Sequence, residues 1–150
     1  MSLLRNQYLL VLVRLLLGCL FVYAAIPKIA DPFAFAVSVY NYKLLPGAGI
    51  GLVAAALPWL ELVAGGCLIM GIRVRSAAVV ITAMLGVFAL ALVVNTLRGI
   101  DVECGCFSTG RAIGWLAVAE DCALLLLGIW YVCCADAVCC LESAFRKAER

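Results

Sequence analysis

The sequence predicts an all-α membrane protein: a polytopic four-helix bundle with both termini cytoplasmic and a short interfacial helix in the first outer loop. Of its 150 residues, 67% are hydrophobic and 13% are charged, against roughly 45–50% and 25% in a typical soluble domain. Four apolar runs each approach the roughly 20 residues that a helix needs to cross about 30 Å of hydrocarbon. Basic residues are also distributed unequally between the two sides that these runs define.

The predicted spans form a single membrane domain over residues 1–150. They cover residues 8–26, 49–70, 76–97 and 113–134. The first run follows Arg5 as a signal peptide would, but it contains Arg14 and lacks a small-x-small cleavage site. We therefore interpret it as a retained span.

The segment from residue 27 to residue 48 is too polar, and too often interrupted by proline, to cross the membrane. Its middle, "FAFAVSVYNY", is rich in aromatic side chains, which favour the membrane–water interface. We expect a short helix lying on the outer surface. Two roles remain open for it: simple anchoring, or a lid over the outer mouth of the bundle.

The charges between the spans predict the orientation. Four spans place six basic residues on the side of the termini: Arg5, Arg73, Arg75, Arg146, Lys147 and Arg150. The opposite side holds Lys28, Lys43, Arg98 and Arg111. Because basic residues favour the cytoplasmic side, we expect a multi-pass protein of the inner (cytoplasmic) membrane, with a cytoplasmic tail over residues 135–150. The net charge of +2 gives no support for nucleic-acid binding.

Four ionisable residues fall inside the predicted spans, where an unpaired charge costs a few kcal/mol. They are Arg14, Glu61, Glu120 and Asp121. Counting about 1.5 Å per residue from the cytoplasmic ends places Arg14 and Glu61 at similar depth and predicts an ion pair. Two roles remain open: the pair fixes which helices are neighbours, or Glu61 and Asp121 belong to a polar pocket beneath the outer loop that passes protons or holds a ligand headgroup. Glu120 points about 100° away from Asp121, so only one of them faces the bundle axis.

The polar stretch "DVECGCFSTGR" carries two cysteines, Cys104 and Cys106, on the side predicted to be oxidising. A disulfide across one residue closes a very small ring, and strained geometry makes such a bond easier to reduce. The sequence contains no histidine, so thiolate exchange is the simplest chemistry for this pair. We therefore predict that Cys104 and Cys106 are the catalytic residues.

Seven further cysteines have other predicted roles. Cys19, Cys67 and Cys122 stand singly within spans and are expected to pack as small apolar residues. Two vicinal pairs at the end of the fourth span, Cys133, Cys134, Cys139 and Cys140, form an alternative soft-metal site. Adjacent positions on a helix splay by about 100°, which makes one four-sulfur cage awkward. Reduced, inert thiols are the commoner outcome there.

The sequence resembles the MauE (methylamine utilisation) branch of the DoxX-like integral membrane protein family, from about residue 14 to residue 131. The resemblance includes "LPWLELVAGGCLIMG" and "CGCFSTGRAIGWLAVAEDCALLLL" and rests on Arg14, Gly18, Lys28, Tyr42, Pro46, Glu61, Gly65, Gly71, Cys104, Cys106, Phe107 and Asp121. It implies a four-helix membrane bundle associated with disulfide formation in secreted proteins, working with a thioredoxin-like partner. Ser108 and Glu120 depart from the glycine and the basic residue that are frequent in the family.

Three functions remain open on these observations. In the first, the chain is a thiol-disulfide oxidoreductase whose Cys104–Cys106 disulfide oxidises client thiols or a thioredoxin-like protein, and a lipid quinone held near Glu61 and Asp121 reoxidises it. In the second, the vicinal cysteine pairs handle a soft metal ion such as mercury. In the third, the chain is a structural membrane subunit; against this, a disulfide that closes so short a loop constrains little of the unfolded chain.

Overall fold

A computed structural model describes residues 7–44, 46–98 and 115–134, and this part of the chain is entirely helical. Its helices are α1 (Gln7–Ala30), α2 (Pro32–Asn41), α3 (Gly47–Met70), α4 (Val74–Leu97) and α5 (Trp115–Cys134). All except α2 are long and apolar enough to cross a membrane. The predictions of an all-helical class, of four candidate spans and of a short helix after the first are confirmed. Predictions for residues 99–114 and 135–150 lie outside the described residues.

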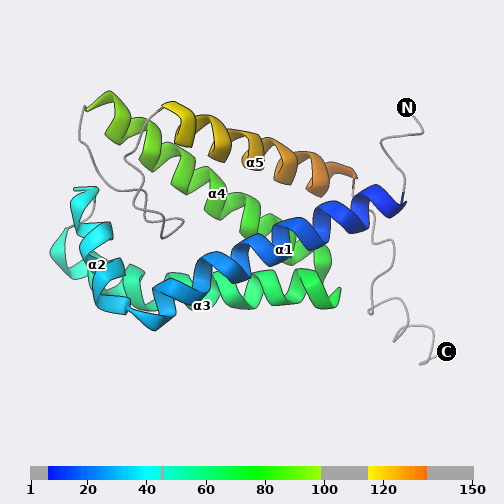
Figure 1. Cartoon of the computed structure of the whole chain (residues 1–150), viewed down its shortest axis with the longest axis horizontal. Helices are drawn as coiled ribbons and strands as arrows, with labels where there is room; N and C mark the ends of the chain where they lie inside the picture. The colour runs from blue at the N-terminus through cyan, green and yellow to red at the C-terminus, as the bar shows by residue number, and fades with distance from the viewer. Residues whose placement is uncertain (1–6, 45, 99–114, 135–150) are drawn as a thin grey trace.

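The four long helices form two antiparallel pairs. α1 packs against α3, and α4 packs against α5. At one end of the molecule lie the start of α1, the turn from α3 to α4 and the end of α5; at the other lie α2, the end of α4 and the start of α5 (Figure 1). The first and last described helices therefore begin and end on one side, as an even number of spans requires.

The first helix is longer than the sequence predicts, continuing four residues past the expected end. Pro27 lies inside α1, and its carbonyl accepts a hydrogen bond from the Asp31 backbone N–H at 3.0 Å. The chain turns at Asp31, beyond the predicted end of the span. The Asp31 carboxylate caps α2 by accepting a hydrogen bond from the Ala34 N–H at 2.9 Å, and Pro32 occupies the first helical position. Aspartate at an N-cap followed by proline is a strong helix start. The predicted interfacial segment therefore begins inside α1, which brings Lys28 into a long helix.

Helix α2 has an inner face and an outer face. Phe35 is buried against the bundle, whereas Phe33, Val37 and Tyr40 are exposed. The three exposed residues are spaced four and three apart, so they form one apolar stripe along the helix. Aromatic side chains on such a stripe suit the membrane–water interface. This stripe supports the predicted surface location of α2, which remains a prediction.

Small residues bring the helices of each pair close together. A Cβ atom on Gly65 would lie 2.9 Å from the Gly18 carbonyl oxygen and 3.2 Å from the Val22 backbone nitrogen. In the other pair, a Cβ atom on Gly128 would lie 2.7 Å from Thr82 Oγ1. Membrane helices associate through such close backbone approaches, because lipid provides no hydrophobic force between them.

Replacing Gly65 by alanine is expected to lower the free energy of unfolding by about 1–3 kcal/mol, the usual cost of overpacking. The obstacle is backbone, which cannot rotate aside as a side chain can. Gly66→Ala is the matched control, because a Cβ there meets only the flexible tip of Met70 at 3.9 Å and gains helix propensity of about 1 kcal/mol. Reversible unfolding in mixed micelles, followed by circular dichroism, measures both. Equal stability of the two variants would contradict the close crossing.

The two helix pairs pack against each other less extensively than the helices within each pair do. α3 and α4 are consecutive in the sequence, yet their mutual packing is much less extensive than that of α1 on α3 or of α5 on α4. A shared core around Leu17, Leu68 and Ile81 joins the pairs. Beside this core, a large cavity separates α3 from α4 and is covered at one end by α2.

Candidate functional site

A buried ion pair joins α1 to α3. Lys28 Nζ lies 2.6 Å from Glu61 Oε1, and the two side chains are only 5% and 2% exposed. Burying two charges is costly, and their attraction offsets that cost only when the geometry is good. Lysine side chains on a helix lean toward its N-terminus, so Lys28 reaches back from the end of α1 into the bundle.

Two aromatic rings enclose the ammonium group of Lys28. Its Nζ lies 5.2 Å from the centre of the Phe35 ring and 5.3 Å from the centre of the Phe88 ring. Phe35 comes from α2 and Phe88 from α4, and the corner at Asp31 folds α2 back so that its ring covers the cation. Cation–π contacts of this kind add about 0.5–2 kcal/mol each. The ion pair and the two rings therefore bring α1, α2, α3 and α4 together at one point.

Asp121 of α5 faces the Lys28–Glu61 ion pair. Lys28, Glu61, Asp121 and Phe88 all line one small cavity of about 30 Å³, which is large enough for a water molecule. Within the described residues, Glu61 Oε2 is buried and accepts no hydrogen bond, so it can accept one from the cavity. The structure thus places Glu61 and Asp121 on one cavity, the arrangement that the polar-pocket alternative requires, whereas the neighbouring Glu120 is exposed.

The cation beside Glu61 is Lys28, which replaces the predicted partner Arg14. Gly18 and Gly65 mark where α1 and α3 cross. Arg14 lies one turn from this crossing in one direction, and Glu61 lies one turn away in the other, because the helices are antiparallel. They are therefore on the order of 12 Å apart along the helix axis. Counting depth from the cytoplasmic ends failed because those ends are not level: α1 begins 11 residues before Gly18, whereas α3 ends five residues after Gly65.

The predicted cysteine sites lie wholly or partly outside the described residues. Cys104 and Cys106 belong to residues 99–114, and Cys139 and Cys140 belong to residues 135–150. Cys133 is exposed, and Cys134 is partly buried at the end of α5. Over residues 7–44, 46–98 and 115–134, no three histidine, cysteine or acidic side chains gather as metal ligands.

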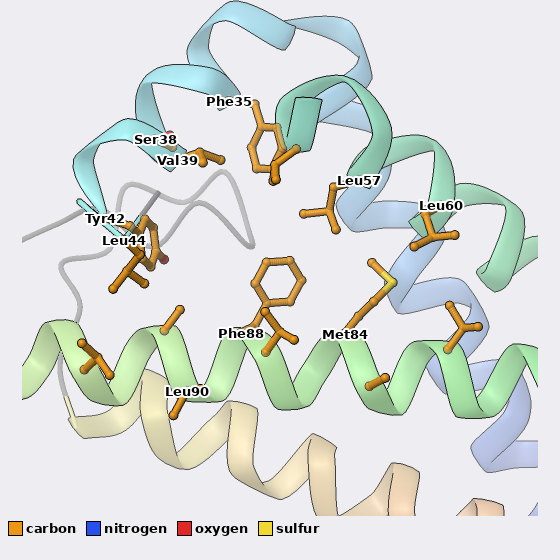
Figure 2. A pocket seen from close by; sticks show the side chains of 16 residues that line it. Phe35, Ser38, Val39, Tyr42, Leu44, Leu57, Leu60, Met84, Phe88 and Leu90 are labelled. Carbon is orange, nitrogen blue, oxygen red and sulfur yellow. The ribbon is translucent and has the colours of Figure 1, made fainter. Parts of the chain in front are cut away.

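The large cavity between α3 and α4 has a volume of about 600 Å³. Figure 2 shows Phe35, Ser38 and Tyr42 approaching it from α2 and the residues after it, while Leu57 approaches from α3 and Phe88 from α4. Almost all of its lining is carbon, unlike the small cavity beside it. Phe88 lines both cavities.

Sequence reasoning missed Lys28, both phenylalanines and the apolar cavity. One available signal was the Asp31–Pro32 pair, whose strong capping preference implies that the first helix ends just before it. That boundary would have placed Lys28 within a helix. Phe88 gave no such signal, because an aromatic residue inside a membrane span is unremarkable in composition.

Comparison with known proteins identifies the family. The sequence pattern of the family described as "Methylamine utilisation protein MauE" matches residues 6–134. The chain belongs to the MauE family. Two MauE proteins, from Paracoccus denitrificans and Methylorubrum extorquens, are 38% and 33% identical to it over 119 and 129 residues. These matches cover 77% and 84% of this chain.

The chain spans 64% of the length of the Paracoccus denitrificans MauE protein and 69% of the Methylorubrum extorquens one. No solved structure matches the chain. Several residues that carry the resemblance to the MauE family have defined places in the structure: Gly18 and Gly65 at the helix crossing, and Lys28, Glu61 and Asp121 around the small cavity.

Proposed function

We propose that this MauE-family chain is a membrane thiol-disulfide redox protein that supports disulfide formation in extracytoplasmic proteins through Cys104 and Cys106. The observation that supports this most directly is the small charged cavity. Lys28 lies two residues from the end of α1, and Asp121 lies six residues from the start of α5. The cavity is thus set about two helical turns from the end of the bundle where residues 99–114 join α4 to α5.

The proposed reaction moves two electrons and two protons. Two client thiols reduce the Cys104–Cys106 disulfide, so that a disulfide forms in the client and two thiols form in the loop. An electron acceptor then takes two electrons and two protons from these thiols and restores the loop disulfide. Glu61 and Asp121 are proposed to carry the protons, because buried carboxylates around a water-sized cavity can pass a proton between them.

The proposed orientation follows the charges on the described ends of the bundle. Arg73 and Arg75 lie beside the turn between α3 and α4, at the end where α1 begins and α5 finishes. Basic residues favour the cytoplasm, so this end is proposed to be cytoplasmic and the cysteine loop extracytoplasmic. The names of the related proteins support a role in methylamine utilisation. Secreted client thiols and a thioredoxin-like protein are the proposed partners.

Differential alkylation followed by mass spectrometry tests the proposal. Purified full-length protein is equilibrated across a graded redox buffer, and each cysteine is scored as thiol or disulfide. Cys104 and Cys106 are expected to titrate together as one two-electron couple. A Cys104→Ser/Cys106→Ser variant is expected to lose all oxidation of a reduced client in proteoliposomes.

The matched control replaces Cys133, Cys134, Cys139 and Cys140 by serine and is expected to retain client oxidation. In whole cells of this control, a membrane-impermeant maleimide should label reduced Cys104 and Cys106 from outside. The proposal fails if these two cysteines form neither a bond with each other nor a mixed disulfide with a client, or if only the quadruple serine variant loses activity.

A further inference from the structure

The cavity between α2, α3 and α4 has the size of a ligand site. Its volume of about 600 Å³ falls in the range of roughly 300–1,000 Å³ typical of small-molecule pockets. It extends along α4 from Val80 to Val94, which is about 21 Å of helix. An elongated molecule therefore fits it better than a compact one.

The residues that line this cavity favour an uncharged ligand. None of the 16 described residues that line the cavity is charged, and among them the only side-chain polar groups are the hydroxyls of Ser38 and Tyr42. The Ser38 hydroxyl already donates to the Ala34 carbonyl at 3.1 Å. A phosphate or carboxylate headgroup would lose its hydration there without gaining a counter-charge, at a cost of several kcal/mol. Phospholipids and fatty acids are therefore poorly suited to this cavity.

The middle of the cavity suits a flat ring. Phe35 and Phe88 reach it from different helices, and both rings also contact the Lys28 ammonium group. A planar ligand ring can stack in offset or edge-to-face geometry against such side chains. Because Phe88 also lines the small cavity, a ring stacked on it lies one phenyl group away from Glu61 and Asp121.

The side of the cavity between α3 and α4 is open to the surroundings. Leu60, Val87 and Leu90 line it and are 46%, 68% and 66% exposed. Since α3 and α4 are candidate membrane spans, these exposed side chains would face hydrocarbon. A long apolar tail could leave the cavity here and continue into the bilayer.

We propose that this cavity binds an isoprenoid quinone, with its ring against Phe35 and Phe88 and its tail passing between α3 and α4. This assignment rests on the proposed function and names its electron acceptor. The quinone takes two electrons and two protons from the two loop thiols, which gives one quinol and one disulfide. Binding itself involves only the described residues of the cavity, so it can be tested apart from the thiols.

Binding is tested with a photoreactive azidoquinone on the purified full-length chain in lipid nanodiscs free of quinone. Mass spectrometry is expected to find the label on peptides from α2, α3 and α4, and a short-tailed ubiquinone is expected to compete with it. Ala91→Phe places a ring in the cavity and is expected to raise the apparent Kd about tenfold or more, equal to 1.4 kcal/mol. Val79→Phe on the same helix is the control, since Val79 is exposed and does not line the cavity.

Val87→Phe provides a second variant at the exposed rim, where misfolding is not a concern, and is also expected to weaken labelling. Labelling that neither variant changes, or that phosphatidylglycerol displaces as well as ubiquinone does, would overturn the assignment. Quinone binding that persists in Cys104→Ser/Cys106→Ser, while Cys104 and Cys106 of the unmodified protein form neither a disulfide with each other nor a mixed disulfide with a client, would leave the site standing and refute the proposed function. Disulfide formation by these two cysteines without any quinone binding would refute the site and leave the proposed function standing.

Discussion

Replacing Lys28 by methionine is expected to lower the free energy of unfolding by about 3–5 kcal/mol, because it leaves the buried Glu61 carboxylate without its cation. Methionine matches the length of the lysine stem, so the loss reports the charge and not a change in volume. Glu61→Leu is expected to cost a similar amount by leaving the ammonium group between Phe35 and Phe88. Lys43→Met is the control, because Lys43 is exposed and such changes fall within about 0.5 kcal/mol.

The double variant Lys28→Met/Glu61→Leu is expected to regain most of the lost stability, since a buried ion pair can be exchanged for apolar residues at little net cost. Unfolding in mixed micelles, followed by circular dichroism for all four variants, gives the coupling energy of the pair. A Lys28→Met variant as stable as Lys43→Met, or a double variant as unstable as the sum of the single ones, would show that the ion pair does not hold α1 against α3.

Replacing Asp121 by asparagine is expected to slow reoxidation of the loop thiols by about 100-fold, the lower range for removing a positioned general acid or base. The carboxamide keeps the size of the side chain but cannot exchange a proton with Glu61 across the small cavity. The rate is measured by mixing reduced protein with quinone in nanodiscs and quenching aliquots with an alkylating reagent.

Glu120→Gln is the matched control for this experiment. It makes the same chemical change one residue earlier on α5, on an exposed side chain that does not line the cavity. We expect it to retain the rate of the unmodified protein. Equal rates in the two variants would remove Asp121 from the proton path and leave it a residue of the helix interface.

The sequence predicted the elements of the fold well because each prediction depended on a local property. Hydropathy and run length are sufficient to count the long helices, and the aromatic segment with flanking prolines is sufficient to mark α2. The end of α1 was misplaced because Pro27 and Lys28 both suggest the end of an apolar run. A proline in a membrane helix is tolerated when neighbouring helices compensate for the lost hydrogen bond, and such neighbours are not visible in the local sequence.

The site was predicted only in part because its geometry depends on how two helices are offset along their axes. Glu61 and Asp121 could be chosen from chemistry alone, since acidic residues inside a span must face the bundle. The partner of Glu61 depends on the crossing at Gly18 and Gly65, which is a packing detail. The apolar cavity was not predictable, because it reflects how loosely α4 packs against α3 and not any residue type.

Phe35 connects helix α2 to the buried ion pair and to the apolar cavity. This single ring covers the Lys28 ammonium group and also forms part of the wall of the apolar cavity. A movement of α2 away from the bundle would therefore uncover the buried charge and widen the apolar cavity in one motion. A displacement of the exposed face of α2 would thus reach the ion pair and the proposed quinone site together.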